Sequence, residues 1–310
     1  MYGTITWLRN KLFDWGIFKQ TEYNIPIISI GNLAMGGTGK TPHIEYLITS
    51  YCKTHKIAVI SRGYGRKTKG LRYVSIHESA SVVGDEPLQI KQKFESVVVV
   101  VCEKRVLAID KVIAEHPEVN LILLDDAFQH RYVKPKLSIL LTEYGRPFWK
   151  DTLVPVGRLR EFAFGWKRAD AIIITKCPEN LQLQIPKILS SKPVLFSRIR
   201  YQMPKIISGL ISNKLILVTG IANPKPLENY LKEQNYTIVK HFKFPDHYNF
   251  EEEDIYKIKQ HLGKDVLLLT TEKDYMRLWS FFKNENFNLG YLPIGIQIEN
   301  APEDWLSLII

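Results

Sequence analysis

One short segment of the 310-residue chain holds the residue types that bind a nucleoside triphosphate. Its residues are Gly36, Gly37, Thr38, Gly39, Lys40 and Thr41. Glycines let backbone N–H groups turn inward onto phosphate oxygens, and the N-terminus of a following helix adds positive potential. In this arrangement Lys40 reaches the β- and γ-phosphates, and the Thr41 hydroxyl binds Mg²⁺. The strict pattern has glycine where this chain has Ala34, but the segment lies between a predicted strand and a predicted helix, as phosphate binding requires.

Two adjacent carboxylates, Asp125 and Asp126, directly follow the apolar run at 121–124. An enzyme that uses a phosphate loop also needs a carboxylate at a strand end to hold its metal ion. The carboxyl ends of parallel strands are where α/β folds bind ligands, so the pair is a candidate magnesium site. The alternative is a solvated turn whose acids cap a helix.

A basic segment without acids runs from Arg62 to Arg72 and contains Tyr64. Such a run is often a solvated loop. It also suits an anionic acceptor with a ring, because aromatic faces pack on sugar rings as well as on bases. Its position after the second predicted strand, at the same sheet edge as the phosphate loop, favours the acceptor interpretation.

Two further acids, Asp85 and Glu86, lie in the turn formed by Gly84 to Pro87. A kinase needs a carboxylate that orients or deprotonates the attacking hydroxyl, although this pattern alone indicates only a turn. His247 follows Asp246 much later in the chain. A lone histidine is usually structural, but one that meets a carboxylate across a cleft can orient such a base.

The elements that position these residues follow from short apolar runs. The predicted strands at 25–30, 56–60, 97–101, 121–124, 137–141 and 171–175 alternate with helical segments such as 42–50 and 104–116. Continuous apolar strands separated by helices indicate a parallel sheet covered on both faces. A second β/α series begins near 215, with predicted strands at 215–219, 237–242, 266–270 and 291–298. We therefore predict a P-loop NTPase-like α/β domain over 1–204 and a smaller α/β domain over 205–310.

Composition narrows the class of protein. Hydrophobic residues make up 45% of the chain, and the formal net charge is +10, which favours anionic partners. Three scattered cysteines indicate a reducing compartment rather than a disulfide framework. We find no secretory signal and no apolar run long enough to span a bilayer. The basic residues form no recognisable nucleic-acid module, and the segment from Thr175 to Pro178 lacks the aspartate that a guanine-specific GTPase needs.

The first 20 residues predict a basic helix rich in aromatic side chains. Leu8, Leu12 and Trp15 recur at helical spacing, with Arg9 and Lys11 beside them. Such a helix can lie in a membrane interface or can simply pack on the domain. The pattern alone leaves both interpretations open.

Together these motifs resemble the tetraacyldisaccharide 4′-kinase family, the lipid A 4′-kinases. The matching segments, in chain order, are 31–42, 61–65, 83–87, 125–130, 154–161, 220–224, 244–247 and 271–274. Each segment alone is unspecific, but the combination is specific and spans nearly the whole chain. Ala34 also fits, because the family's loop opens at Gly31. Ala127 and Phe128 depart from the residues that the family commonly carries.

The resemblance implies transfer of the γ-phosphoryl group of ATP to the 4′-hydroxyl of a tetraacyldisaccharide 1-phosphate in lipid A biosynthesis. The implied cofactors are ATP and Mg²⁺. The acceptor is a membrane lipid, so the family implies an enzyme bound peripherally to the cytoplasmic face of the bacterial inner membrane. We also expect a monomer. The interfacial interpretation of the N-terminal helix is then favoured. Compared with the family, we expect this helix to be shorter at its start, through a late start codon or a truncated membrane helix.

The resemblance also assigns roles. It makes Asp85 the catalytic base and His247 its dyad partner from the second domain. It assigns magnesium binding to Thr41, Glu86, Asp125 and Asp126. It assigns acceptor binding to Ser61, Arg62, Tyr64, Gln129, His130, Arg105, Arg158 and Arg160. Among these, Arg105, Arg158 and Arg160 neutralise phosphate charge. Two alternatives remain from the residues themselves: a P-loop ATPase that acts as a switch or chaperone, and a nucleotide-binding module without activity.

Overall fold

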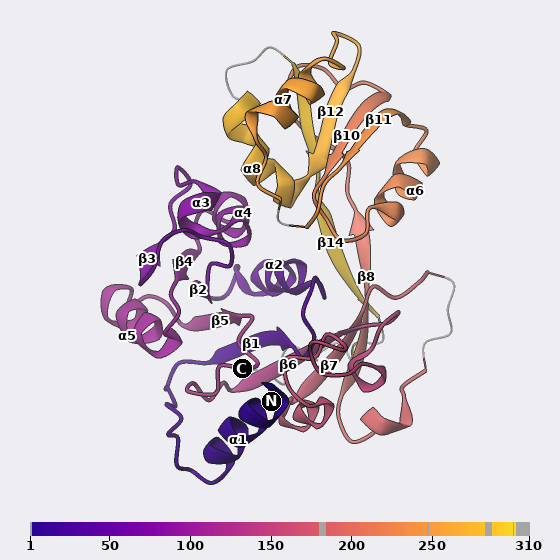
Figure 1. The fold of residues 1–310 in the computed structure, drawn as a ribbon. Coiled ribbons are helices and arrows are strands. Elements are labelled where there is room, and N and C mark those ends of the chain that lie inside the picture. Colours follow the sequence, from indigo (N-terminus) through magenta and orange to yellow (C-terminus); the bar gives the residue numbers. More distant parts are fainter. Residues whose placement is uncertain (1, 180–183, 247, 283–286, 300, 302–310) are drawn as a thin grey trace.

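Two sheets, a larger and a smaller one, dominate the fold (Figure 1). The computed structural model describes residues 2–179, 184–246, 248–282, 287–299 and 301. The nine strands of the larger sheet are β1 (Ile27–Asn32), β2 (Ile57–Ser61), β3 (Arg72–Tyr73), β4 (Val98–Val101), β5 (Leu121–Asp125), β6 (Leu137–Glu143), β7 (Ala171–Thr175), β8 (Val194–Tyr201) and β14 (Ile294–Glu299). The five strands of the smaller sheet are β9 (Lys205–Ser208), β10 (Lys214–Thr219), β11 (Thr237–Lys243), β12 (Leu267–Thr271) and β13 (Asn288–Leu292).

The helices fall into two groups along the chain. Before β8 they are α1 (Tyr2–Asp14), α2 (Lys40–Tyr51), α3 (Ala80–Val83), α4 (Asp85–Lys93) and α5 (Arg105–Glu115), with short 3₁₀ turns η1 (Phe148–Lys150), η2 (Ala163–Arg168) and η3 (Lys187–Leu189). Around the smaller sheet they are α6 (Lys225–Glu233), α7 (Glu252–Lys259) and α8 (Glu272–Phe282). The predicted α/β class, with a large parallel sheet and a smaller α/β unit, is confirmed.

The larger sheet has its topological switch point at β1. Its strand order is β14-β8-β7-β6-β1-β5-β2-β4-β3, so the chain first builds outward from β1 on one side and later on the other. All its pairings are parallel except those of the two edge strands, β3 and β14. Ligands in such sheets bind beside the carboxyl end of the switch strand. The glycine-rich segment leaves β1 at that end.

Both faces of the larger sheet are buried. Ile28 and Ile30 of β1 belong to a core shared with α2 and α4, whereas Ile27 belongs to a core shared with α5. Alternate residues of a strand point to opposite faces, so every residue of β1, β2, β5 and β7 is buried. This explains why the sequence shows continuous apolar runs rather than alternation.

The last predicted strand is wrong in one respect. The apolar run at 291–298 forms two strands that lie in different sheets and are separated by Pro293. β13 completes the smaller sheet, and β14 returns to pair antiparallel with β8 of the larger sheet. Hydrophobicity reports that both strands are buried, but it carries no information on which sheet each one joins. The boundary between the two domains at residue 205 stays a prediction. Residues 294–299, which follow the smaller sheet in the chain, form a strand of the larger sheet.

The backbone at Gly31 leaves no room for a side chain. A Cβ at this position would lie 2.6 Å from Cβ and 2.7 Å from the backbone nitrogen of Phe128. We expect Gly31→Ala to lower the free energy of unfolding by about 1–3 kcal/mol, because the clash involves backbone that cannot rotate away. Urea denaturation measures the change. Gly145→Ala is the matched control, since nothing lies within 4 Å of a Cβ there. Equal stabilities of the two variants would contradict the prediction.

Candidate active site

The glycine-rich loop between β1 and α2 has the backbone of an anion cradle. Gly36 and Gly39 adopt positive φ angles of 106° and 89°, which residues with a Cβ rarely adopt. Inside the loop, the Asn32 amide nitrogen donates to the Thr38 hydroxyl at 2.8 Å. The loop is thus held by its own side chains, and its end leads directly into a helix N-terminus.

A second segment braces the loop from outside. The backbone N–H of Met35 donates to the Arg158 carbonyl at 2.7 Å, and the N–H of Arg160 donates to the Leu33 carbonyl at the same distance. The 154–161 segment is one of those that resemble the family. In the structure its backbone forms hydrogen bonds with the phosphate loop.

The lysine of the phosphate loop forms an ion pair with one of the two strand-end carboxylates. Lys40 opens α2, and its Nζ lies 3.9 Å from Oδ2 of Asp126. Thr41, the next residue, is buried in the first turn of the helix. The structure therefore brings the two predicted parts of the site, the loop and the strand-end acids, to one edge of the sheet.

Asp125 is the last residue of β5, and its side chain is buried. Its Oδ2 accepts a hydrogen bond from the Ser61 hydroxyl at 3.0 Å, while Oδ1 has no hydrogen-bond partner within the described part of the chain. Burial, and then the negative charges of Glu86 and Asp126, raise the pKa of Asp125 to about 7. A buried carboxylate oxygen without a donor is a suitable ligand for a hard cation.

Asp126 is held charged by neighbouring cations. Its backbone is left-handed, with φ 46°, and both carboxylate oxygens accept from the Arg160 guanidinium at 2.8 and 3.1 Å. Burial acts to raise the pKa of Asp126, but Lys40 and Arg160 outweigh it and lower this pKa below its ordinary value. Arg160 also donates to the Asn32 side chain, so it joins β1 to the acid pair.

The predicted magnesium ligands surround one region without forming a complete cage. Among residues 2–179 and the other described ranges, no three His, Cys, Asp or Glu side chains converge on one point. Magnesium bound with a nucleotide commonly uses one or two carboxylates together with phosphate oxygens and water. Asp125, with its unpartnered oxygen, fits that requirement, whereas Asp126 is already engaged by Arg160.

The second acid pair opens α4 at the same edge of the sheet. Gly84 precedes it with φ 96°, which turns the chain sharply into the helix. Asp85 is buried, and its Oδ1 accepts the backbone N–H of Glu86 at 2.9 Å. The charge of Glu86 acts on the pKa of Asp125, and a Cβ at Gly84 would lie 3.1 Å from the carbonyl oxygen of Tyr64, so the start of α4 lies near the strand-end acids and the turn after β2. Asp85 and Lys40 thus share one side of the molecule.

Helix α8 brings two cations from the smaller sheet to this acid pair. Nζ of Lys273 lies 3.5 Å from Oε1 of Glu86, and Nε of Arg277 lies 3.9 Å from Oδ2 of Asp85. The two basic residues are four positions apart, so they share one face of the helix. The sequence marked 271–274 only as a family segment, and Arg277 was missed. Its helical spacing from Lys273 was the available signal.

The proposed dyad partner, His247, lies outside the described residues. Its neighbour Asp246 is described, with Oδ1 3.3 Å from Nζ of Lys273. The 244–246 segment therefore reaches the same contact between the two sheets as α8.

The predicted acceptor residues at the ends of β2 and β4 surround the buried acid. Ser61 bonds Asp125, and the side chains of Arg62 and Tyr64 are exposed in the following turn. Arg105 is buried, and its guanidinium donates to the carbonyls of Cys102 at 3.0 Å and Asp125 at 3.3 Å. These residues share the loop's edge of the sheet.

Gln129 and His130 follow the acid pair and pack under α1. The Gln129 amide donates to the Asn32 carbonyl at 2.8 Å. Burial, and then the positive charges of Arg105, Arg9 and Arg62, lower the pKa of His130 to about 4, so this ring is neutral at physiological pH. A neutral imidazole here can donate or accept a hydrogen bond but adds no charge.

Arg158 lies on the outer flank of the loop and is engaged by acids of the protein. Its guanidinium pairs with Asp151 at 3.1 Å and Glu143 at 3.3 Å. Arg158 and Arg160 were both predicted as phosphate-neutralising side chains. In this structure each of them holds a carboxylate, which positions the segment around the loop.

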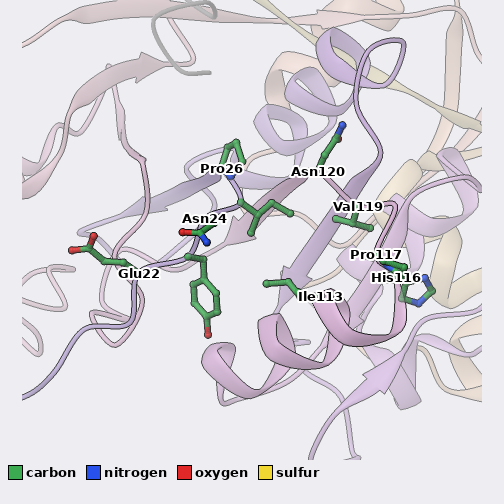
Figure 2. Close-up of a pocket in the computed structure, with 10 residues that line it drawn as sticks. Glu22, Asn24, Pro26, Ile113, His116, Pro117, Val119 and Asn120 are labelled. Carbon is green, nitrogen blue, oxygen red and sulfur yellow. The ribbon is translucent and has the colours of Figure 1, made fainter.

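A hollow at the opposite edge of the larger sheet lacks these features. A cavity of about 580 Å³ lies beside the amino ends of β1 and β5, lined by residues that include Tyr23, Ile113 and His116 (Figure 2). It contains none of the predicted site residues. The predicted site residues that the structure describes therefore lie away from this hollow.

A charged cluster beneath the acid turn fastens α8 to the larger sheet. Lys93 of α4 bridges Glu45 of α2 at 2.7 Å and Glu272 of α8 at 3.0 Å. The Gln89 amide donates to the other oxygen of Glu45 at 2.7 Å. Helices α2, α4 and α8 are thus joined by one largely buried network of charged and polar side chains, which contacts the first residue of α8 and the C-terminal half of α4.

Comparison with known families decides the identity. The sequence model of the family described as LpxK, tetraacyldisaccharide-1-P 4′-kinase, matches residues 1–310. The chain belongs to this family. The kinase transfers the γ-phosphoryl group of ATP to the 4′-hydroxyl of a tetraacyldisaccharide 1-phosphate in lipid A biosynthesis. Membership excludes the two alternatives, an ATPase switch and a module without activity.

Curated relatives of the kinase agree over their length. The tetraacyldisaccharide 4′-kinase of Cytophaga hutchinsonii is 38% identical, over 100% of this chain and 92% of its own. The enzyme of the same name from Bacteroides thetaiotaomicron is 42% identical, over 90% of this chain and 80% of its own. That from Flavobacterium johnsoniae is 41% identical, over 98% and 92%.

A solved structure resembles the kinase in fold. It is the crystal structure of LpxK from Aquifex aeolicus, described as an "apo" form in complex with ATP. The TM-score is 0.81 at 28% sequence identity, and the match covers 99% of this chain and 94% of that chain. The family expectation of an ATP-dependent kinase on a P-loop fold is confirmed.

The buried glutamate of the charged cluster, Glu45, predicts a pH effect on stability. Burial raises the pKa of Glu45 to about 7 from 4.5, against the charge of Lys93 and with that of Glu272. The folded kinase then holds a proton that the unfolded chain releases above pH 4.5, so the contribution of Glu45 to stability falls as pH rises from about 4.5 to 7. We expect Glu45→Gln to remove about 3 kcal/mol of this pH dependence, at about 1.4 kcal/mol for each unit of pKa shift.

Urea denaturation across pH 4.5–8 measures the effect. Glu252→Gln, an exposed substitution in the first turn of α7, is the control and should leave the pH dependence of the native kinase intact. Identical slopes for native protein and Glu45→Gln would show that Glu45 does not take up the proton.

Proposed function

We propose that the site at the carboxyl edge of the larger sheet carries out the phosphoryl transfer, with Asp85 as the base. The proposal rests on one observation: Asp85 is buried at the start of α4, at the same edge of the sheet as Lys40 and the acid pair. Phosphoryl transfer depends on positioning and charge stabilisation more than on covalent chemistry. This edge supplies a base, a phosphate cradle and several cations.

ATP binds in this proposal with its phosphates on the loop. The backbone amides of Gly36, Gly37, Thr38 and Gly39 and the ammonium group of Lys40 hold the phosphate oxygens. The positive φ of Gly36 and Gly39 supports this assignment, because it lets successive N–H groups face one concavity. The ion pair of Lys40 with Asp126 is long, at 3.9 Å, so the lysine can turn to a phosphate at little cost.

Magnesium is the second proposed cofactor. Thr41, Glu86, Asp125 and Asp126 provide its oxygen ligands, and Asp125 is the best supported because of its unpartnered buried oxygen. When bound, the ion would neutralise charge on the β- and γ-phosphates. Asp126 would be shared with Arg160, which keeps the carboxylate oriented.

The acceptor hydroxyl is proposed to face Asp85. Asp85 accepts the proton as the 4′-oxygen attacks the γ-phosphorus, and His247 from the smaller unit orients it. The Arg277 guanidinium, with Nε 3.9 Å from Oδ2 of Asp85, is a further cation beside the proposed base. Lys273 beside Glu86 adds positive charge close to where the phosphoryl group passes.

The anionic disaccharide is proposed to lie against the basic rim of the edge. Ser61, Arg62, Tyr64, Arg105, Gln129, His130, Arg158 and Arg160 are the acceptor residues in this proposal. Exposed Arg62 and Tyr64 are best placed for direct contact with a phosphate and a sugar ring, since both project from the turn after β2. The ion pairs of Arg158 and Arg160 favour an indirect role for these two. Closure of the smaller unit over α4 would exclude water from the γ-phosphate.

Association with a membrane surface is proposed through α1. One side of this helix is fastened to the larger unit, because Arg9 donates to the Gln129 carbonyl at 2.8 Å and Phe13 packs against Tyr132. Ile5 and Trp15 are more than 60% exposed. Within the described ranges, no helix is long and apolar enough to cross a bilayer. We propose a monomer that docks by this helix on the cytoplasmic face of the bacterial inner membrane.

The base assignment predicts a separation of chemistry from nucleotide binding. Asp85→Asn should lower kcat by about 10²–10⁴-fold, because the amide keeps the shape but cannot take the proton. Binding of Mg·ATP should remain within a few fold, since Asp85 lies outside the phosphate loop. Transfer of label from γ-labelled ATP to the disaccharide in detergent micelles measures turnover, and calorimetry measures binding. Near-native turnover of the variant would remove Asp85 from the base role.

The membrane assignment predicts weaker vesicle binding when the exposed apolar side chains of α1 and of the turn that follows it are made polar. Replacing both Ile5 and Trp15 with serine should lower the fraction that sediments with phosphatidylglycerol–phosphatidylethanolamine vesicles by about tenfold, because the apolar area available for burial is lost. Val239→Ser, an exposed apolar site on β11, is the control. Equal sedimentation of the double variant and the control would place the membrane contact elsewhere.

A further inference from the structure

A buried histidine adjoins the phosphate loop and has no role in the proposed chemistry. His43 lies on α2, one helical turn after Gly39, and is 2% exposed. Its Nδ1 lies 2.7 Å from the Gly39 carbonyl oxygen, and its Nε2 lies 2.9 Å from the Ser197 hydroxyl on β8. The ring therefore joins the last residue of the loop to a strand 154 positions later.

The two contacts fix the protonation of the ring. A carbonyl oxygen can only accept, so Nδ1 carries the hydrogen and donates it to Gly39. Nε2 is then the acceptor, and the Ser197 hydroxyl donates to it. These two contacts together select a single neutral tautomer of the ring.

The bond to Gly39 bears on the next peptide N–H. The Gly39–Lys40 peptide is planar, and its N–H points opposite to its C=O. Holding the carbonyl toward His43 therefore aims the Lys40 N–H out of the helix N-terminus, where a phosphate binds. Gly39 has φ 89° and no side chain, so its peptide plane rotates easily unless a neighbour holds it. The backbone N–H of His43 donates to the same carbonyl over a longer distance, 3.3 Å. The hydrogen bond from the imidazole is therefore the shorter of the two.

The bond to Ser197 makes the ring a rigid brace. Ser197 is fully buried in β8, between β7 and β14. Its backbone carbonyl accepts the N–H of Cys177 at 3.0 Å, so the serine cannot drift from the sheet. A leucine at position 43 would fill similar space, but it would leave the Ser197 hydroxyl buried without an acceptor and release the Gly39 carbonyl from its shorter bond.

We propose that His43 is a positioning residue for ATP, which braces the Gly39–Lys40 peptide against Ser197 of β8 so that the loop is set for phosphate before the nucleotide arrives. The inference rests on the proposed role of the loop in holding the phosphates. His43 touches no reacting atom. β8 also runs from the larger sheet toward the smaller one beside β14, so the brace joins the loop to the strands that connect the two units (Figure 1).

The test compares His43→Leu and Ser197→Ala in the full-length kinase. His43→Leu should raise the Kd of Mg·ATP and the KM for ATP about tenfold, because one loop-orienting hydrogen bond is lost. The kcat at saturating ATP and the KM for the disaccharide should stay within about twofold. Ser197→Ala, the milder change, should raise the Kd about threefold. The double variant should bind ATP no more weakly than His43→Leu, because both remove the same brace.

The controls separate positioning from general loss of stability. Ile48→Val, also buried on α2, should lower the Tm and leave the Kd of Mg·ATP unchanged. An unchanged Kd in both His43→Leu and Ser197→Ala, whatever their Tm, would overturn the proposal. So would additive effects in the double variant. Lys40→Ala tests the underlying assignment: if its Kd stays native, the phosphate role of the loop fails rather than the role of His43.

Discussion

Two adjacent carboxylates at the end of β5, one buried and one half-buried, determine which counter-charges and hydrogen-bond donors the surrounding structure must supply. Neither Asp125 nor Asp126 can lose its water without a counter-charge or a hydrogen-bond donor, since an isolated buried charge is very costly. Lys40 and Arg160 supply charge to one, and Ser61 supplies a donor to the other. One carboxylate oxygen of Asp125 keeps no hydrogen-bond partner within the described residues, and this is the feature on which the proposed magnesium site rests.

The parts of the fold and site that the sequence predicts are local. β-branched apolar runs reveal strands buried on both faces, and glycines before Lys40 reveal the loop, because each depends on a few neighbouring residues. The strand-end position of Asp125 also follows, since a parallel sheet brings its carboxyl ends to one edge. Family resemblance then supplies the reaction, which composition and spacing leave open.

The parts that it misses depend on contacts between distant segments. Nothing near Arg160 indicates that it clasps Asp126 rather than a substrate phosphate, and nothing near His43 points to Ser197. Arg277 lies in a helix whose own pattern is merely amphipathic, and its meeting with Asp85 depends on how two sheets face each other. Such partnerships arise from tertiary packing, so a single sequence carries no direct record of them.

The antiparallel pairing of β8 with β14 has a geometric consequence for how this chain is assembled. Tyr201 lies opposite Ile294, so the roughly ninety residues between them leave and re-enter the larger sheet at adjacent points. Topologically the smaller unit is an elaborated hairpin loop on an edge strand. Since the entropic penalty for closing a longer loop grows only slowly with its length, a whole α/β layer could be grafted at this edge without disturbing the strands that carry the chemistry.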